Sequence, residues 1–108
     1  MDKIFGENNM KWVWTWGGEF FGYFEGDNIW TYDGKHTGKI QNNLIYDKNG
    51  RYLGEIINER LITNDSKKSY ISSSFTPYAN RGGYAPYANY AGYAMYAGHS
   101  DFPFPNEF

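Results

Sequence analysis

The feature that most constrains this chain is a sequence pattern that returns every 16 residues. Three segments align at this spacing without a gap, at residues 14–18, 30–34 and 46–50, and each ends in a pair of turn-forming residues. The pairs are Gly-Gly, Asp-Gly and Asn-Gly, which tolerate positive φ at both central positions of a type I′ hairpin turn. Three such turns in register predict a series of β-hairpins.

Placing a two-residue turn at each hairpin tip predicts which residues face each other across the strands. The predicted pairs are Trp16–Glu19, Trp14–Phe21, Val13–Gly22, Trp30–Thr37, Ile29–Gly38, Tyr46–Leu53 and Ile45–Gly54. Between the hairpins, residues 25–28, 41–44 and 57–60 are expected to turn the chain back, giving a continuous antiparallel meander. Because side chains alternate along a strand, this register also predicts two faces that keep their identity through every turn.

The two predicted faces differ in chemistry. One is apolar and carries glycine at a repeated level, so we expect it to be the interior. Its members are Val13, Ile29, Ile45, Leu61, Phe20, His36, Tyr52, Gly22, Gly38, Gly54, Phe24, Ile40 and Ile56. The other is aromatic and charged, and its members are Trp14, Trp16, Phe21, Tyr23, Trp30, Tyr32, Lys35, Lys39, Tyr46, Lys48, Arg51 and Glu55.

The repeat continues beyond the three aligned hairpins. Ile4 and Gly6 stand 16 residues before Phe20 and Gly22, and residues 61–65 stand 16 after 45–49. This offset predicts that the N-terminal strand completes a fourth hairpin with the last strand. Eight strands that close on themselves leave no exposed edge. We therefore expect residues 1–66 to form an all-β domain, a small eight-stranded antiparallel meander barrel with fourfold pseudo-symmetry; an open, strongly curled sheet is the alternative.

Residues 67–108 are expected to form a non-globular C-terminal tail. From residue 75 to 98 the sequence has a period of three, and its later triplets begin with Tyr84, Tyr87, Tyr90, Tyr93 and Tyr96. This period matches a polyproline II helix, which would align the tyrosines along one edge, whereas long 3₁₀ helices are uncommon. A disordered low-complexity segment is the other interpretation. An ordered tail would dock on the barrel or thread through it, or it would mediate self-association, with these tyrosines as its contacts.

Composition argues against several classes of function. The chain has 108 residues, a formal net charge of -2, no cysteine, and two distant histidines, His36 and His99. Such a charge does not attract nucleic acid or an anionic membrane from a distance, and the histidines make a poor metal site. No segment has the apolar length of a signal peptide or a membrane span. We expect a cytoplasmic protein with no cofactor and no nucleic-acid partner.

No group of residues predicts catalysis, because no nucleophile, base or carboxylate pair is brought together by spacing. His36 falls in the predicted interior, where a core role is favoured over a functional one. Asp47 stands where the other repeats have threonine, and we interpret it as a rim residue rather than a pore or ligand group.

Two candidate binding surfaces remain. The outer patch interleaves cations with aromatic rings, as surfaces that bind nucleic acid or lipid headgroups do, although charges on an outward face usually serve only solvation. It comprises Trp14, Trp30, Tyr32, Lys35, Lys39, Tyr46, Lys48 and Arg51. The interior set would line an apolar ligand, and it comprises Val13, Ile29, Ile45, Leu61, Phe24, Ile40 and Ile56.

Residues 32–38, the segment 44–54 and the triplet tail together resemble the bacterial fourfold β-flower proteins. Over residues 3–65 the shared motif is a turn glycine followed four residues later by a second glycine, at Gly18/Gly22, Gly34/Gly38 and Gly50/Gly54. The resemblance implies a shallow pseudo-symmetric barrel with an apolar interior, a shape likened to the tubby and scramblase-type barrel. Tubby-like relatives bind membrane lipids or phosphoinositides, but the resemblance carries no established activity. Tails in this family are often rich in Arg or Lys, whereas this one has tyrosine.

The sequence as a whole favours a non-enzymatic binding or assembly module whose Tyr-rich tail docks on the barrel or mediates self-association. A small barrel that binds a lipid, another apolar ligand or a membrane surface is the alternative. An enzyme is the weakest of the three hypotheses.

Overall fold

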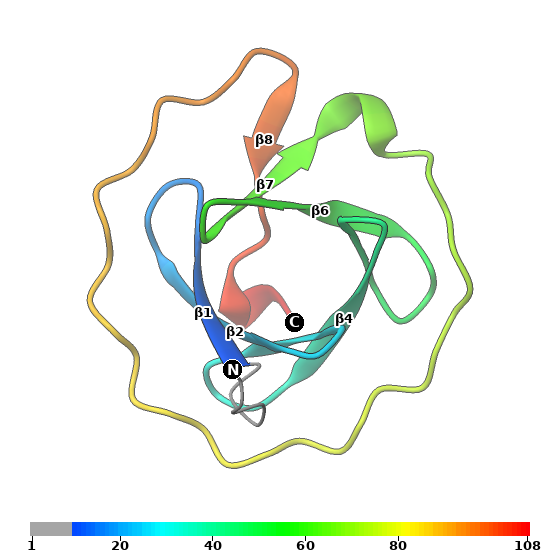
Figure 1. Ribbon diagram of the computed structural model, residues 1–108, viewed down its shortest axis with the longest axis vertical. Coiled ribbons are helices and arrows are strands. Elements are labelled where there is room, and N and C mark those ends of the chain that lie inside the picture. Colours follow the sequence, from blue (N-terminus) through cyan, green and yellow to red (C-terminus); the bar gives the residue numbers. More distant parts are fainter. Residues whose placement is uncertain (1–9) are drawn as a thin grey trace, which may run out of the picture.

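The computed structural model describes residues 10–108, which form a closed β-barrel of seven strands with an eighth strand outside it (Figure 1). The strands are β1 (Met10–Thr15), β2 (Phe20–Glu25), β3 (Asn28–Thr31), β4 (His36–Gln41), β5 (Leu44–Tyr46), β6 (Tyr52–Ile57), β7 (Arg60–Asn64) and β8 (His99–Asp101). Two 3₁₀ turns, η2 (Asp65–Lys67) and η3 (Pro105–Glu107), follow β7 and β8. Within the described residues, no helix has the length and apolar character needed to cross a membrane.

The expected closure is present, but the seam of the barrel differs from the prediction. Strands β1 to β7 pair antiparallel in chain order, and β1 then pairs with β7 in parallel, with Trp14 beside Arg60. A meander with an odd number of strands ends in the direction in which it began, so its closing pair has to be parallel. Strand β8 pairs antiparallel with β7, with Ser100 opposite Thr63. The predicted N-terminal strand around Ile4 and Gly6 lies outside the described residues.

The hairpin tips are three-residue loops, which corrects the predicted two-residue type I′ turns. In the first hairpin the Gly18 amide donates to the Thr15 carbonyl at 2.9 Å, and the Thr15 amide donates to the Glu19 carbonyl at 2.8 Å. Only the loop's last residue has positive φ, at 97° in Gly18, 96° in Gly34 and 81° in Gly50. A three-residue loop that ends in a left-handed glycine is a common hairpin connection, and an Asp-Gly pair fits both turn types. Trp16 therefore lies within a loop and does not pair with Glu19.

Each of these hairpins also contains a β-bulge that exchanges side chains between the faces. The predicted pairs Val13–Gly22, Ile29–Gly38 and Ile45–Gly54 are present, but the next pairs toward the loop are Trp14–Phe20, Trp30–His36 and Tyr46–Tyr52. One residue in each returning strand is therefore extra: Phe21, Thr37 or Leu53. The three-residue loop shifts the alternation by one residue and the bulge restores it.

The bulges correct the predicted composition of both faces. Phe20, His36 and Tyr52 were expected inside the barrel, but they pair with outward-facing aromatic residues and lie outside it. Phe21 was expected outside and instead belongs to the inner core, with Leu53 packed against that core. The loop is one residue longer than predicted, and the bulge adds one more residue. Together they leave unchanged which residues beyond them face inward, so counting residues from the glycines could not distinguish the two arrangements.

The inner core is built on the level of residues predicted for it. Val13, Ile29, Ile45 and Leu61 are fully buried, at 0% exposure each. Two neighbouring aromatic residues, Phe21 and Phe24, belong to the same cluster, and Ile40 and Ile56 pack against it. These side chains face the barrel axis from each of the three described hairpins and from β7.

The C-terminal segment fills the axis that these residues surround. The Phe102 ring lies 5.3 Å and the Phe108 ring 5.7 Å from the Phe21 ring, measured between centroids. Figure 1 shows this segment, in red, ending within the ring of strands. At its start, the Asp101 carboxylate accepts hydrogen bonds from the Trp16 and Gly17 amides, both at 2.9 Å. Residues 67–108, expected as a non-globular tail, thus supply one strand and two side chains of the core.

We predict that Phe102→Ala destabilises the fold by about 3 to 5 kcal/mol, because the deletion of a buried ring leaves a cavity. Phe102 is 1% exposed, whereas Phe104 in the same segment is 38% exposed, so Phe104→Ala should cost less than about 1 kcal/mol. The free energy of unfolding in urea measures both. Equal losses in the two variants would show that the segment does not fill the barrel in solution.

Candidate functional site

Residues 70–98, here called the belt, form a ring around the outside of the barrel (Figure 1). The belt contains almost no regular secondary structure, yet its backbone is bonded to the barrel throughout. It leaves the barrel after η2, passes the third, second and first hairpin loops in that order, and returns to the barrel at β8. The belt therefore runs around the repeats in the reverse of their order in the chain.

The belt is fixed to the barrel by two series of backbone hydrogen bonds. In the first, belt amides donate to the loop glycines: Ser72 to Gly50 at 2.7 Å, Arg81 to Gly34 at 2.8 Å and Tyr90 to Gly18 at 2.8 Å. In the second, they donate to carbonyls two residues earlier: Phe75 to Lys48 at 2.9 Å, Tyr84 to Tyr32 at 2.7 Å and Tyr93 to Trp16 at 3.1 Å. Donors in each series are nine residues apart and acceptors are 16 apart. Three triplets of the belt thus span one hairpin repeat, which gives the triplet period a structural reason.

The loop glycines are required where the belt crosses them. A Cβ atom on Gly18 or Gly34 would lie 2.0 Å from the carbonyl oxygen of Tyr90 or Arg81, and one on Gly50 would lie 2.1 Å from that of Ser72. Any side chain at these positions would displace the belt backbone. The glycine therefore serves two purposes, since it also supplies the positive φ that ends the loop.

A layer of aromatic side chains lies between the outer face of the barrel and the belt. Trp14 stacks on Tyr90 with ring centroids 3.9 Å apart, and its Nε1 donates to the Ala88 carbonyl at 3.0 Å. Trp16 Nε1 donates in the same way to the Ala94 carbonyl at 2.9 Å. The buried members of this layer are Trp14, Trp16, Phe20, Tyr23, Trp30, His36 and Tyr52. The belt thereby closes a second core outside the barrel wall.

Two arginines hold the belt through cation–π contacts. The Arg81 guanidinium lies 3.7 Å from the centroid of the Trp30 ring and forms an ion pair with Glu25 at 2.7 Å. By the repeat spacing, Arg81 and Trp30 occupy the places of Tyr90 and Trp14, so a cation–π pair replaces an aromatic stack. The Arg81 side chain is 40% exposed, and exposed cation–π pairs contribute about 0.5 to 1 kcal/mol.

The second cation lies at the seam. Arg60 is 4% exposed and its guanidinium lies 3.9 Å from the Tyr93 ring centroid. It also donates to the Ala91 carbonyl at 3.0 Å and to the Trp16 carbonyl at 3.3 Å. Sequence reasoning did not select either arginine. For Arg81 a signal was present, because it is the one cation at the start of a triplet in residues 75–98.

His36 joins the barrel to the belt through a hydrogen bond that depends on its protonation. Its Nδ1 accepts from the Tyr78 amide at 3.0 Å, and its ring stacks on the rings of Trp30 and Tyr78. Burial lowers the pKa of His36, and repulsion from Lys39 and Arg81 acts in the same direction. The neutral ring, whose Nδ1 can accept a hydrogen bond, is therefore the form that the folded protein favours.

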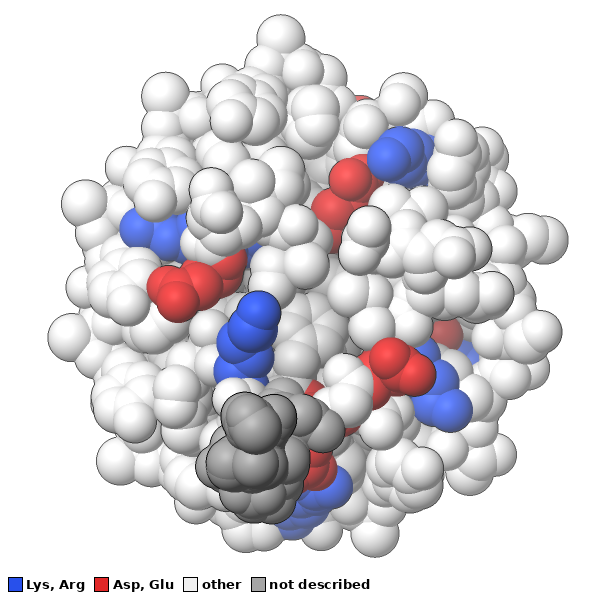
Figure 2. Space-filling model, in the orientation of Figure 1, with Lys and Arg blue, Asp and Glu red and all other residues white. Residues whose placement is uncertain are grey.

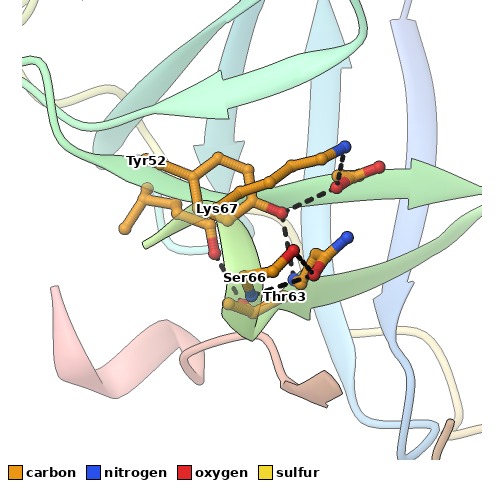
Figure 3. A network of polar contacts seen from close by, with 7 residues as sticks. Tyr52, Thr63, Ser66 and Lys67 are labelled. Atoms are coloured by element: carbon orange, nitrogen blue, oxygen red, sulfur yellow. Dashed lines mark hydrogen bonds and ion pairs between the residues drawn. The ribbon is translucent and has the colours of Figure 1, made fainter. Parts of the chain in front are cut away.

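The chain just before the belt is held by a network of polar contacts on β6, β7 and η2 (Figure 3). The Tyr52 hydroxyl donates to Glu55 Oε2 at 2.8 Å and accepts from the Asn64 amide at 3.0 Å, and Lys67 Nζ lies 2.9 Å from Glu55 Oε2. Burial opposes the charge on Glu55, but hydrogen bonds from Lys67 and Tyr52 outweigh it and lower the pKa of this carboxyl. Burial raises the pKa of Tyr52 far above its usual range. Asn64 Oδ1 accepts from the Ser66 amide and hydroxyl, which fixes the turn where the chain leaves the barrel.

The structure places the predicted outer patch largely beneath the belt. Trp14 and Trp30 are buried there, so they are not part of an open surface, because the belt covers them. The patch cations are spread out: Lys39 Nζ lies 5.2 Å from the centroid of the Phe75 ring, Lys35 Nζ donates to the Phe108 carbonyl at 2.8 Å, and Arg51 lies just before β6, where its backbone forms an isolated β-bridge with Ile71. Of the remaining patch members, Tyr32 and Tyr46 are half-buried and Lys48 is exposed.

The other predicted sites also have definite places. The tail tyrosines contact the aromatic layer, with Tyr84 and Tyr87 near Trp12, Tyr90 on Trp14, and Tyr93 and Tyr96 at Trp16. Asp47 Oδ1 accepts from the Asn49 and Arg51 amides at 2.9 and 3.0 Å, and Thr15 and Thr31 accept equivalent bonds in their own loops. Asp47 is thus a turn-capping residue at the rim. The interior set lines a core that the chain's own rings fill.

Residues 10–108 contain no group of three His, Cys, Asp or Glu residues that could hold a metal ion. What the described geometry provides is a groove around the barrel in which the chain's own extended belt is bound. Recognition rests on backbone carbonyls at fixed intervals, indole donors between them and glycines that permit close approach.

We predict that Gly34→Ala loosens the belt, whereas Gly26→Ala does not. Both glycines have positive φ, at 96° and 61°, so both substitutions carry backbone strain of about 1 to 2 kcal/mol, with the larger strain at Gly34. A Cβ at Gly26 meets nothing within 4 Å, whereas one at Gly34 meets the Arg81 carbonyl. Gly34→Ala should therefore cost at least about 1 kcal/mol more and should accelerate chymotrypsin cleavage at the belt tyrosines. Equal cleavage rates in the two variants would contradict belt docking at this loop.

We also predict a contribution of His36 to stability that is lost in acid. Because the folded-state pKa lies below the ordinary value of 6.5, the unfolded chain binds the proton more readily. The contribution is therefore complete above pH 6.5 and declines as the pH falls from 6.5 toward the folded-state pKa. Urea unfolding between pH 7 and the onset of carboxylate protonation measures it.

His36→Phe keeps a ring but removes the titrating group, so it should flatten this part of the pH profile. His99→Gln serves as the control and should retain the decline. A decline that persists in His36→Phe would assign the effect to another group.

We compared the chain with known protein families, curated proteins and solved structures. A protein-family model described as 4-fold beta flower protein matches residues 4–98, which include the described strands β1 to β7 and the whole belt. No curated protein and no solved structure matches the chain. With a family model matched over most of its length, the chain belongs to the 4-fold beta flower protein family.

Proposed function

We propose that this protein is a non-enzymatic binding and assembly module. Its barrel holds a triplet-repeat strand in the circumferential groove, the chain's own belt occupies that groove, and the outer side of the belt binds a second copy. The observation that carries the proposal is the double series of backbone bonds, in which nine belt residues match each 16-residue hairpin.

The way in which the groove contacts the belt supports a binding role. Most barrel-to-belt hydrogen bonds use backbone atoms, so the groove selects a period and a conformation more than a set of side chains. Polyproline II segments suit such recognition, because they are extended and have little entropy to lose on binding. At about 3.1 Å per residue, nine residues of this conformation span about 28 Å.

The outer side of the belt supports assembly through one uncharged arc. Residues 84–98 include no Asp, Glu, Lys or Arg, and the five tyrosines in this arc are each between 44% and 51% exposed. Each ring covers the aromatic layer on one side and meets solvent on the other. Figure 2 shows that charged residues are also sparse over one face of the molecule, where acidic and basic residues lie in small groups separated by uncharged surface.

A second copy of the chain is a suitable partner for this arc. Extended apolar surface of this kind marks interaction sites on soluble proteins. Two such arcs can meet without repulsion between like charges or desolvation of ions, which are the usual costs of a contact between identical surfaces. Half-exposed tyrosines each offer on the order of 100 Å², so the five together offer about 500 Å², an area typical of weak, transient association.

We predict that the protein self-associates through the arc, as measured by sedimentation velocity over a range of concentrations. Met95→Glu places a charge within the arc, at a residue 43% exposed, and should raise the dissociation constant at least about tenfold. Ile71→Glu adds the same charge to the belt outside the arc, at a residue 79% exposed, and should leave association unchanged. A monomer at every concentration, or an equal effect of both substitutions, would overturn the assembly part of the proposal.

An apolar ligand or lipid along the barrel axis has less support. Phe102 and Phe108 pack against Phe21 there, so a ligand on the axis would have to displace the C-terminal segment.

A further inference from the structure

A pocket of about 560 Å³ opens where the barrel wall, the belt and the C-terminal segment meet. The wall contributes Thr37 and Leu53, the belt contributes Pro77 and Asn80, and the C-terminal segment contributes Phe108. The pocket borders the belt at His36, which also lines it, and no part of the proposed assembly surface at residues 84–98 does so.

The pocket lies where the three hairpins differ in the size of one residue, the extra residue of the bulge. The extra residue of the bulge is Phe21 in the first hairpin, Thr37 in the second and Leu53 in the third. Phe21 is fully buried and fills its place beside Phe102. Threonine and leucine are smaller, so the second and third hairpins leave space at the same level. The smaller bulge residues of the second and third hairpins therefore leave an open volume on one side of the barrel.

The lining combines an apolar surface with cations. Leu53, Phe108, Pro77 and Pro103 supply the apolar part, and Lys35 and Lys48 supply the charge. A pocket of this volume suits a small organic molecule, and a few polar groups among apolar ones are typical of such sites.

The acidic groups of the pocket are already engaged. Asp47 Oδ1 caps its own loop, and Glu107 Oε2 accepts from the Phe104 amide at 3.0 Å. Lys35 Nζ is held by the Phe108 carbonyl. Among residues 10–108, no carboxylate forms an ion pair with Lys48. Lys48 is therefore the cation that the pocket offers to a ligand.

We propose that this pocket binds a small free organic anion, with its carboxylate or phosphate at Lys48 and an apolar body against Leu53 and Phe108. An ammonium head fits less well, because Lys35 and Lys48 line the same space and one oxygen of each carboxylate, Asp47 Oδ1 and Glu107 Oε2, already accepts from a backbone amide. We take the apolar body to be about the size of one aromatic ring, because Leu53, Pro77 and Phe108 form the walls of the pocket and the pocket is open on one side.

Three probes that differ only in the head group test the charge preference. We would titrate the full chain with phenylpropionate, phenylpropanol and phenylpropylamine and follow backbone amide shifts by NMR. Saturable shifts are expected at residues 35–37, 47–53 and 108, with phenylpropionate binding about tenfold more tightly than the alcohol and the amine binding most weakly. Equal affinities for the three probes, or shifts centred elsewhere, would overturn the proposal.

Two lysine variants separate the pocket from general charge. Lys48→Gln should raise the dissociation constant for phenylpropionate to that for phenylpropanol, with no effect on the alcohol. Lys68→Gln removes an exposed cation from the end of η2, outside the pocket, and should change neither. An equal loss in both variants would indicate attraction by net charge rather than a site.

A third variant tests the space itself, and a vesicle arm tests the source of the anion. Thr37→Phe restores the residue of the first hairpin and should abolish binding of all three probes while the amide spectrum elsewhere stays dispersed; retained binding would contradict the location. Should Thr37→Phe fail to fold, the Lys48→Gln comparison still decides. Sedimentation with vesicles that contain phosphatidylglycerol should leave the protein in solution, and binding to vesicles without binding to free anions would overturn the proposal in its stated form.

Discussion

The match between nine belt residues and one 16-residue hairpin is the interaction on which the rest of this structure depends. A barrel of seven short strands encloses a thin core, and small domains of this size have little apolar burial to offset chain entropy. Here the outer face of the wall is aromatic as well, and it is stable in water only when it is covered. The belt provides the cover, and its backbone bonds keep it in one register around the whole circumference.

The bulges make this two-sided wall possible. In each hairpin, a loop of three residues followed by one extra residue turns a large ring outward and the next side chain inward. Phe20 thereby reaches the belt while Phe21 reaches the axis. Without the bulge, side chains would still alternate between the two faces of the wall. The outward rings of the returning strand would then no longer lie beside the tryptophans, and the aromatic layer would no longer match the belt triplets.

The sequence repeat was sufficient to predict the hairpins, the closure and the innermost level at Val13, Ile29, Ile45 and Leu61. It was not sufficient to place His36 or Phe21, because the loop length and the bulge change parity together and cancel beyond the glycine level. A dipeptide such as Asp-Gly is compatible with both arrangements, and in the folded protein the three-residue loop places its glycine against the belt. Local sequence contains no record of that contact.

The entry of Phe102 into the axis could not be predicted for a related reason. Phenylalanine, proline and asparagine near the chain's end give no period, and nothing local distinguishes a ring that fills a barrel from one that is exposed, such as Phe104. What decides is the volume left by the other repeats and the Asp101 carboxylate at the first loop. The three-residue period of the tail was visible in the sequence, and so was the 16-residue period of the hairpins. The two periods lie in different segments, so the match of nine tail residues to one hairpin appears only in the folded structure.

Departures from the repeat carry chemical information that the repeat itself does not. Where the first hairpin has Trp14 stacked on Tyr90, the second has Trp30 under Arg81 with Glu25 as counter-ion. Where the first has Phe21, the second has Thr37 and an open volume. Backbone bonds to the belt are the same in both hairpins, so they fix the strand position and leave the side chains free to differ. In a pseudo-symmetric barrel, the scaffold is therefore found by aligning the hairpins, and candidate sites are found where one hairpin fails to repeat another.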